Sequence, residues 1–274
     1  MSTKKVPPGE ARARVTRRVV LTVGGLTLLA GYVLDPARQV TETAGARDAR
    51  GATAAGQVPD VSASRGAATH PARAEPRAGG EQPMYHVDDG PKAIALTVDD
   101  GPSPVYTPQV LRLLDKYQVT ATFSMIGRQV DAYPGVARDV SAAGHVIANH
   151  TWSHLDLASL RPAAVADQMN RATGAIHQAT GRVPTLFRAP YGYWSPAVLQ
   201  HCAQAGMTPL DWSVDPRDWS RPGVASIVGN IMRNTRTGSI ILEHDGGGNR
   251  SETVAALKIV LPRLLAAGYR FRTP

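Results

Sequence analysis

From residue 93 onward, short apolar runs alternate with amphipathic segments. The apolar runs predict seven strands, at 93–98, 121–126, 145–148, 186–189, 208–212, 239–242 and 269–272. The amphipathic segments predict helices that begin near Thr107, Pro134, Pro162, Pro196, Gly223 and Ser251. Pro262 lies inside the last of these and should kink or split it. Strict alternation of strand and helix in one domain predicts an α/β fold with a parallel sheet, either a barrel or a doubly wound sheet.

The first 84 residues lack this alternation. Six Lys or Arg residues precede an uncharged run at 19–34, and the junction TRRVVL resembles a bacterial twin-arginine signal. We therefore predict an export signal or membrane anchor at 1–34, with its basic end cytoplasmic and the rest of the chain outside. Residues 35–84 are rich in Ala, Gly, Arg, Pro and Ser and predict a disordered linker. The folded domain is predicted to span 85–274, either extracellular or anchored to the outer side of the cytoplasmic membrane.

The positive charge of the chain lies mostly outside this domain. Residues 1–83 carry 12 Lys/Arg against 7 Asp/Glu, so they supply +5 of the formal net charge of +8. The rest of the chain has no basic stripe interleaved with aromatic residues, which argues against nucleic-acid binding. Cys202 is the only cysteine, so no intramolecular disulfide can form.

Polar residues follow the predicted strands at the points where these end. Five of the seven predicted strands end at or just before such residues, which are Asp99, Asp100, His150, His154, Arg188, Asp215, Asp218 and His244. The carboxyl ends of parallel strands in a barrel meet at one face, where active sites form. The sequence therefore predicts that these side chains converge.

Two of these groups suggest metal chemistry. Asp100, His150 and His154 offer one carboxylate and two imidazoles, and a divalent ion held by three protein groups keeps positions open for a water and a carbonyl. Asp99 stands beside Asp100 as a spare carboxylate that can serve as a base. This combination predicts hydrolase chemistry. Zinc is the preferred ion because it is a Lewis acid without redox chemistry, and cobalt is a possible substitute.

Five short motifs then stand in order along the chain: TVDDGP, HTWSH, RAPYG, DPRDW and ILEH. Between about Lys92 and Phe271 the chain resembles the NodB-type polysaccharide deacetylases of carbohydrate esterase family 4. This resemblance implies a distorted (β/α) barrel of about seven strands rather than a regular eightfold one. It also implies a glycan substrate.

Carried over to this sequence, the resemblance implies a metal bound by Asp100, His150 and His154, with the two histidines one helical turn apart if that stretch is helical. Asp99 would be the base that deprotonates the metal-bound water. Arg188 would keep Asp99 ionised and oriented.

The resemblance assigns further roles around this centre. His244 would be the general acid that protonates the leaving amine, and Asp218 would keep His244 charged. The Tyr191 N–H would stabilise the oxyanion. Trp219 and Leu242 would wall the slot for the acetyl methyl group, although ordinary core packing is an alternative for Trp219.

Some residues depart from the family pattern or fall outside it. Val98 and Ala189 replace a common aromatic residue and a proline, and Glu243 adds a charge next to His244. Because a strand alternates its faces, Glu243 should point away from the site. No catalytic role is predicted for His145, His177 or His201. The glycines at 246–248 are predicted to form a flexible turn.

The leading hypothesis is an exported, metal-dependent deacetylase that removes N-acetyl groups from N-acetylglucosamine units of chitin-like oligomers or peptidoglycan. It is expected to be a monomer. Its membrane contact would come only from the N-terminal segment. Alternatives are an O-acetyl esterase acting on xylan, a wall-glycan-binding module without activity, and a non-haem iron oxygenase. Asp99, Arg188 and His244 count against the binding module, because binding needs neither base nor acid.

Overall fold

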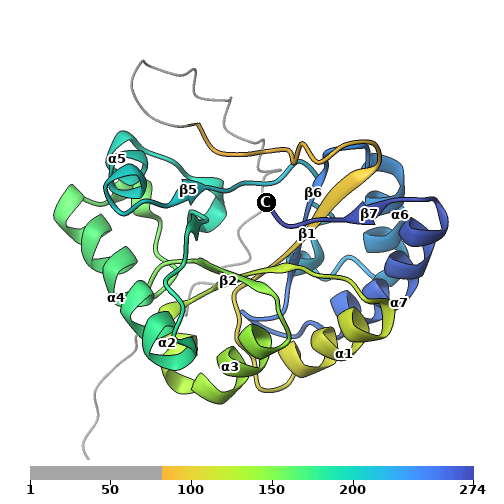
Figure 1. Cartoon of the computed structure of the whole chain (residues 1–274), viewed down its shortest axis with the longest axis horizontal. Coiled ribbons are helices and arrows are strands. Elements are labelled where there is room, and N and C mark those ends of the chain that lie inside the picture. The colour runs from red at the N-terminus through yellow and green to blue at the C-terminus, as the bar shows by residue number, and fades with distance from the viewer. Residues whose placement is uncertain (1–81) are drawn as a thin grey trace, which may run out of the picture. The chain divides into compact units, whose positions relative to one another are not determined.

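The computed structural model describes residues 82–274, which form a curled parallel sheet with helices around it (Figure 1). The predicted export segment at 1–34 and nearly all of the predicted linker lie outside the described residues, so both stay predictions. The last residue of that predicted linker, Met84, is paired with the sheet: its N–H donates to Pro209 O at 2.8 Å and its carbonyl accepts from Asp211 N–H at 2.8 Å.

The sheet confirms the predicted number of strands. The strands are β1 (Ala93–Asp99), β2 (Thr122–Met125), β3 (Val146–Asn149), β4 (Leu186–Phe187), β5 (Thr208–Pro209), β6 (Ile240–His244) and β7 (Arg270–Phe271). They are ordered β5-β4-β3-β2-β1-β6, with β7 added to the start of β1. All seven residues of β1 are buried, as expected for a central parallel strand covered on both faces.

The barrel is distorted because β5 and β6 are joined only by isolated bridges. Val214 pairs directly with Ile241, and the segment near residues 84–86 bridges to Leu210 on one side and to Ser239 on the other. This irregular closure fits the distorted barrel of about seven strands that the resemblance implies, rather than a regular eightfold one.

Helices connect successive strands. They are α1 (Thr107–Tyr117), α2 (Gly127–Ala132), α3 (Pro134–Ala142), α4 (Pro162–Thr180), α5 (Pro196–Gln204), α6 (Val224–Asn234) and α7 (Ser251–Ala266), with short 3-10 turns η1 (Leu157–Ser159), η2 (Pro190–Gly192) and η3 (Asp218–Ser220).

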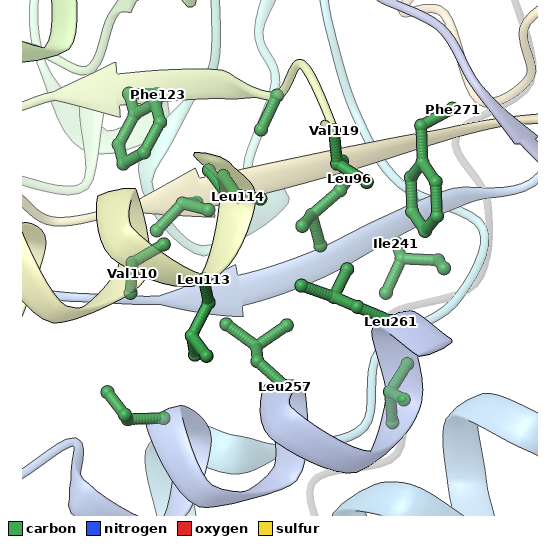
Figure 2. Packing of buried hydrophobic residues seen from close by; sticks show 14 of the residues in the cluster. Leu96, Val110, Leu113, Leu114, Val119, Phe123, Ile241, Leu257, Leu261 and Phe271 are labelled. Atoms are coloured by element: carbon green, nitrogen blue, oxygen red, sulfur yellow. The ribbon is translucent and has the colours of Figure 1, made fainter. Parts of the chain in front are cut away.

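The largest hydrophobic cluster lies between the sheet and the helices α1 and α7 (Figure 2). Val110, Leu113 and Leu114 of α1 recur at the helical spacing and are all buried. Leu257 and Leu261 of α7 complete this layer against the strands. The cluster fixes β1 and β6, whose last residues lie at the candidate site.

Several local predictions need correction. Thr107 followed by Pro108 predicts an N-cap at Thr107, but Thr107 is the first residue of α1 and the N-cap is Tyr106. The Thr107 hydroxyl donates to Asp245. Pro262 does not split α7, which runs unbroken through it. Helix α2 was not predicted, because six residues are too few to show a helical period. Strand β4 is shorter than predicted because Pro190 has no N–H with which to continue the ladder and opens η2.

Close packing of α2 against α4 gives a test of this arrangement. A Cβ on Gly127 would lie 2.7 Å from the Ala172 backbone and 2.7 Å from the Trp152 ring, whereas one on Gly174 would meet nothing within 4 Å. We expect Gly127→Ala to lower the free energy of unfolding by about 1–3 kcal/mol. The matched control Gly174→Ala, inside α4, should raise it by up to about 1 kcal/mol because alanine loses less backbone entropy. Denaturant unfolding of both variants measures this, and equal effects would contradict the packing.

Candidate active site

The carboxyl ends of four strands of the sheet bring the predicted site residues together. Asp99 closes β1 and His244 closes β6, where they are register partners. His150 follows β3 directly, and Arg188 follows β4 directly. Side chains that are far apart in the sequence therefore meet at the carboxyl edge of the sheet.

Asp100, His150 and His154 form a group that could bind a metal ion, with one ligand atom from each lying within 4.8 Å of the others. Asp100 Oδ1 is 3.5 Å from His150 Nε2 and 3.2 Å from His154 Nε2. This buried oxygen has no hydrogen-bond partner among residues 82–274. A buried carboxylate oxygen that faces two imidazole nitrogens fits the donor set of a divalent cation.

The two histidines are brought together by a loop, so the condition of a helical stretch, under which they would lie one turn apart, is not met. Residues 150–154 contain no helix, and Thr151 and His154 have φ values of 67° and 60°. Two local hydrogen bonds support this left-handed geometry: Thr151 N–H donates to Asn149 Oδ1 at 2.8 Å, and His154 N–H donates to Thr151 Oγ1 at 2.9 Å. Asn149 and Thr151 are thus supporting residues that sequence reasoning did not find.

The protonation of this group suits metal binding. His150 Nδ1 lies 2.8 Å from the Arg188 carbonyl, which can only accept, so Nδ1 carries the proton and the Nε2 lone pair faces Asp100. Burial, with the nearby His150, lowers the pKa of His154 to about 4. Burial acts to raise the pKa of Asp100, but interactions with His150 and His244 outweigh it and hold the pKa well below its usual value.

Asp99 is held by a fully buried arginine. Arg188 Nη1 donates to Asp99 Oδ1 at 2.8 Å and to Thr97 Oγ1 at 2.7 Å, while Nη2 donates to Asp211 O at 2.8 Å. Asp99 Oδ2 stays on the metal-group side, 3.9 Å from His150 Nε2. Thr97 was missed by sequence reasoning, although its position two residues before Asp99 on one strand places both on the same face. Asp211 was missed because its contribution is a backbone carbonyl, which residue type does not reveal.

His244 is paired with Asp218. Its Nδ1 lies 2.7 Å from Asp218 Oδ1, and its N–H donates to Oδ2 at 2.9 Å. Thr253 Oγ1 also donates to Oδ2, at 2.6 Å. Burial acts to lower the pKa of His244, but the Asp218 charge outweighs it and raises the pKa to about 9. The imidazole is therefore charged at neutral pH, as a proton donor requires.

The residues predicted to contact substrate surround these groups. Tyr191 has φ 63° in η2, its side chain is 56% exposed, and its ring lies 4.8 Å from that of His154. Trp219 in η3 is 44% exposed, with the Arg217 guanidinium 5.0 Å from its ring, so it is not a core residue. Leu242 is buried on β6, two residues before His244 and therefore on the same strand face.

Asp245 is a buried carboxyl group at the site that sequence reasoning missed. Its Oδ2 accepts from Thr107, while Oδ1 has no hydrogen-bond partner among the described residues. Burial raises its pKa to about 7. A Cβ on Gly101 would collide with this carboxyl group, so Asp245 packs against the turn that follows Asp100. The sequence did contain a signal for Asp245, because an acidic residue directly follows the histidine at the end of a strand.

Histidines outside the site have ordinary surroundings. The buried His145 accepts from Ala121 N–H through Nδ1 at 3.3 Å, which is a packing role. His201 Nε2 lies 3.1 Å from Asn170 Oδ1 on the helical surface.

Within residues 82–274, no helix combines the length and apolarity needed to cross a membrane.

Comparison with known proteins agrees with this geometry. The family model described as polysaccharide deacetylase matches residues 86–210. A peptidoglycan-N-acetylglucosamine deacetylase of Bacillus cereus is 44% identical over 191 residues, which cover 69% of this chain and 89% of that protein. The chain belongs to the polysaccharide deacetylase family.

Two further comparisons extend the polysaccharide deacetylase assignment. A chitooligosaccharide deacetylase of a Bradyrhizobium species is 42% identical over 192 residues, covering 66% of this chain and 88% of that protein. A solved structure of a peptidoglycan N-acetylglucosamine deacetylase, in complex with a hydroxamate-type benzamide, superposes with a TM-score of 0.67 at 32% identity. That match covers 69% of this chain and 89% of the other. It confirms the predicted distorted barrel.

The three-residue donor set predicts that the protein binds one divalent ion tightly. We expect Asp100→Asn to weaken zinc affinity by at least about tenfold, because an amide oxygen is a neutral and poorer ligand. His177→Gln, on the exposed face of α4, is the matched control and should leave affinity unchanged. Competition with a chromogenic chelator measures both. Equal zinc affinity in the two variants would exclude Asp100 as a ligand.

Proposed function

We propose that this protein is an exported, divalent-metal-dependent hydrolase that removes acetyl groups from the N-acetylglucosamine units of peptidoglycan or of a chitin-like glycan. The relatives named above act on these two glycans according to their names. Export rests on the sequence of the N-terminal segment. The observation that carries the proposal is the pairing of Asp99 with His244 on adjacent strands, next to the Asp100, His150 and His154 group.

Zinc fits this group best because two neutral imidazoles and one carboxylate are its usual ligands in hydrolases. When bound, such an ion supplies a Lewis acid for the acetyl carbonyl and lowers the pKa of a coordinated water. Asp100, His150 and His154 would hold such an ion.

Asp99 is the base in this proposal. Its Oδ2 faces the metal group, while its Oδ1 is bound to Arg188. Because Arg188 holds only Oδ1, the Oδ2 atom of Asp99 is free to accept a proton from the attacking water. Thr97 and the Asp211 carbonyl fix the guanidinium in turn, which keeps the base oriented.

His244 is the acid. Hydrolysis of an acetamide expels an amine, which leaves readily only when its nitrogen has been protonated. Asp218 holds the imidazole in its charged form and fixes the ring through Nδ1, so Nε2 is the nitrogen that donates the proton. The Tyr191 N–H supports the negative charge that develops on the acetyl oxygen. Leu242 and the exposed Trp219 provide apolar surface for the acetyl methyl group.

Acetate release tests the function directly. We expect the zinc-loaded protein to release acetate from peptidoglycan or chito-oligomers in preference to acetylxylan, and a chelator to abolish this. Asp99→Asn should lower kcat by about 10²–10⁴-fold, because the general base is lost. Asp167→Asn, an exposed α4 carboxylate paired with Arg171, is the control and should retain full activity. Acetate release that persists after metal removal would contradict the mechanism.

The raised pKa of His244 predicts a pH dependence. The charged imidazole is present below its pKa of about 9 and is lost above it, so kcat/KM should fall as pH rises through about 9. In Asp218→Asn this alkaline limb should move down toward 6.5, the ordinary value for histidine, because the largest stabilising charge is removed. Asp115→Asn, which changes an exposed carboxylate on α1, should leave this pH dependence unchanged. An unchanged limb in Asp218→Asn would exclude His244 as the titrating acid.

A further inference from the structure

A cavity of about 190 Å³ lies beside Asp100, and no step of the proposed mechanism uses it. Its walls are the turn after β1, the residues Gln129 and Tyr133 around the end of α2, and the glycines at 246–248 after β6. Asp100 borders the cavity and also belongs to the group that could bind a metal. The cavity therefore adjoins the candidate active site and can receive a part of the substrate that does not react.

Hydrogen bonds hold two walls of this cavity in place. Ser103 N–H donates to Thr107 Oγ1 at 2.7 Å, which fixes the turn after β1. Arg250 donates from Nε to the Gly246 carbonyl at 2.6 Å and from Nη2 to the Gly247 carbonyl at 3.2 Å. A ligand that enters such a preformed cavity orders few protein groups, so its binding loses little free energy to conformational entropy.

The groups that line the cavity suit an uncharged, polar ligand with an apolar face. The Gln129 amide and the Tyr133 hydroxyl have no hydrogen-bond partner among residues 82–274, and neither do the N–H groups of Gly247 and Gly248. Tyr133 is 38% exposed, so its ring is accessible. No Lys or Arg is among the described residues that border the cavity, so no side-chain cation is present to pair with an anion. A sugar ring matches this set, because its hydroxyl groups donate and accept while its C–H face is apolar.

The size of the cavity limits what it can hold. Its volume of about 190 Å³ is below the roughly 300–1,000 Å³ of sites that enclose drug-sized ligands. It therefore suits a single sugar unit, not a longer stretch of glycan. If the reacting unit of a glycan lies at the metal group, a unit bonded directly to it is within reach of a cavity that Asp100 borders.

We propose that this cavity is a subsite for the uncharged sugar next to the unit that loses its acetyl group. Gln129 binds polar groups of this sugar, and Tyr133 packs against the apolar face of its ring. The inference rests on the proposed function, and it specifies the substrate as an oligomer or polymer rather than a free monosaccharide.

Kinetics on substrates of different length test the subsite. In the wild type, kcat/KM for acetate release should be at least about tenfold higher for chitotetraose than for N-acetylglucosamine, because the monosaccharide cannot fill the cavity. Gln129→Leu keeps a similar volume without the amide, so KM for chitotetraose should rise about three- to tenfold while kcat stays within about twofold. Tyr133→Ala should change KM in the same direction. Gln178→Leu, an exposed side chain on α4, is the matched control and should change neither constant.

Isothermal titration of chitotetraose into the zinc-loaded Asp99→Asn protein measures the subsite without turnover. In this background Gln129→Leu should raise Kd by the same factor of about three to ten, and Gln178→Leu should leave it unchanged. Zinc affinity, measured by chelator competition, should be equal in all these proteins, because neither glutamine belongs to the metal group. Equal zinc affinity also shows that the variants are folded and that Asp100 is undisturbed.

Chitotetraose binding that is equally strong in Gln129→Leu and Gln178→Leu would overturn the subsite. So would a wild type that deacetylates N-acetylglucosamine as efficiently as chitotetraose. Either result leaves the proposed function standing, provided that the wild type releases acetate. If the wild type releases acetate from no glycan, the proposed function fails, and the titration alone then decides whether the cavity binds a sugar.

Discussion

The buried ion pair between Arg188 and Asp99 is the constraint on which the candidate site depends. Arg188 is 0% exposed, so its charge has to be balanced inside the protein, and Asp99 does this at 2.8 Å. The same guanidinium also binds Thr97 and the carbonyl of Asp211, and so ties β1 to the segments that follow β4 and β5. Removing one partner of such a pair costs about 3–5 kcal/mol, since a buried charge is left uncompensated. The orientation of Asp99 and the stability of the barrel therefore both depend on this one ion pair.

Local backbone strain is concentrated around this pair. Asp100, Thr151, His154 and Tyr191 have φ values of 73°, 67°, 60° and 63°, although none of them is glycine. Non-glycine residues in the left-handed region cost free energy and persist only where the surrounding structure fixes them. Here that structure is the parallel sheet, whose strand ends set where each turn must begin. The strained turns aim side chains at a common point, which a regular strand or helix end would not do.

The sequence predicted the fold and the convergence of the site, but not its supports. Strand-end positions identified Asp99, Arg188 and His244 because a parallel sheet places all such ends at one edge. The spacing of His150 and His154 is compatible with a helical turn, but the residues lie in a loop, since one spacing can arise from different backbone paths. Residue type does not reveal the groups that hold the site residues in place when these are backbone atoms, such as the Asp211 carbonyl. Helix α2 and the irregular closure between β5 and β6 depend on tertiary packing, which local pattern does not encode.

Burial alone does not decide the direction in which the pKa of a carboxyl group at this edge is shifted. The sign of the charges beside the group decides it. Burial acts to raise the pKa of both Asp100 and Glu243. Asp100 faces histidines, which reverse the effect and keep it an anion suited to a cation. The Asp218 carboxylate acts on Glu243 in the same direction as burial and raises its pKa further. The pKa values of two buried carboxyl groups, one just after β1 and one on β6, are thus shifted in opposite directions, because the charges beside them differ in sign.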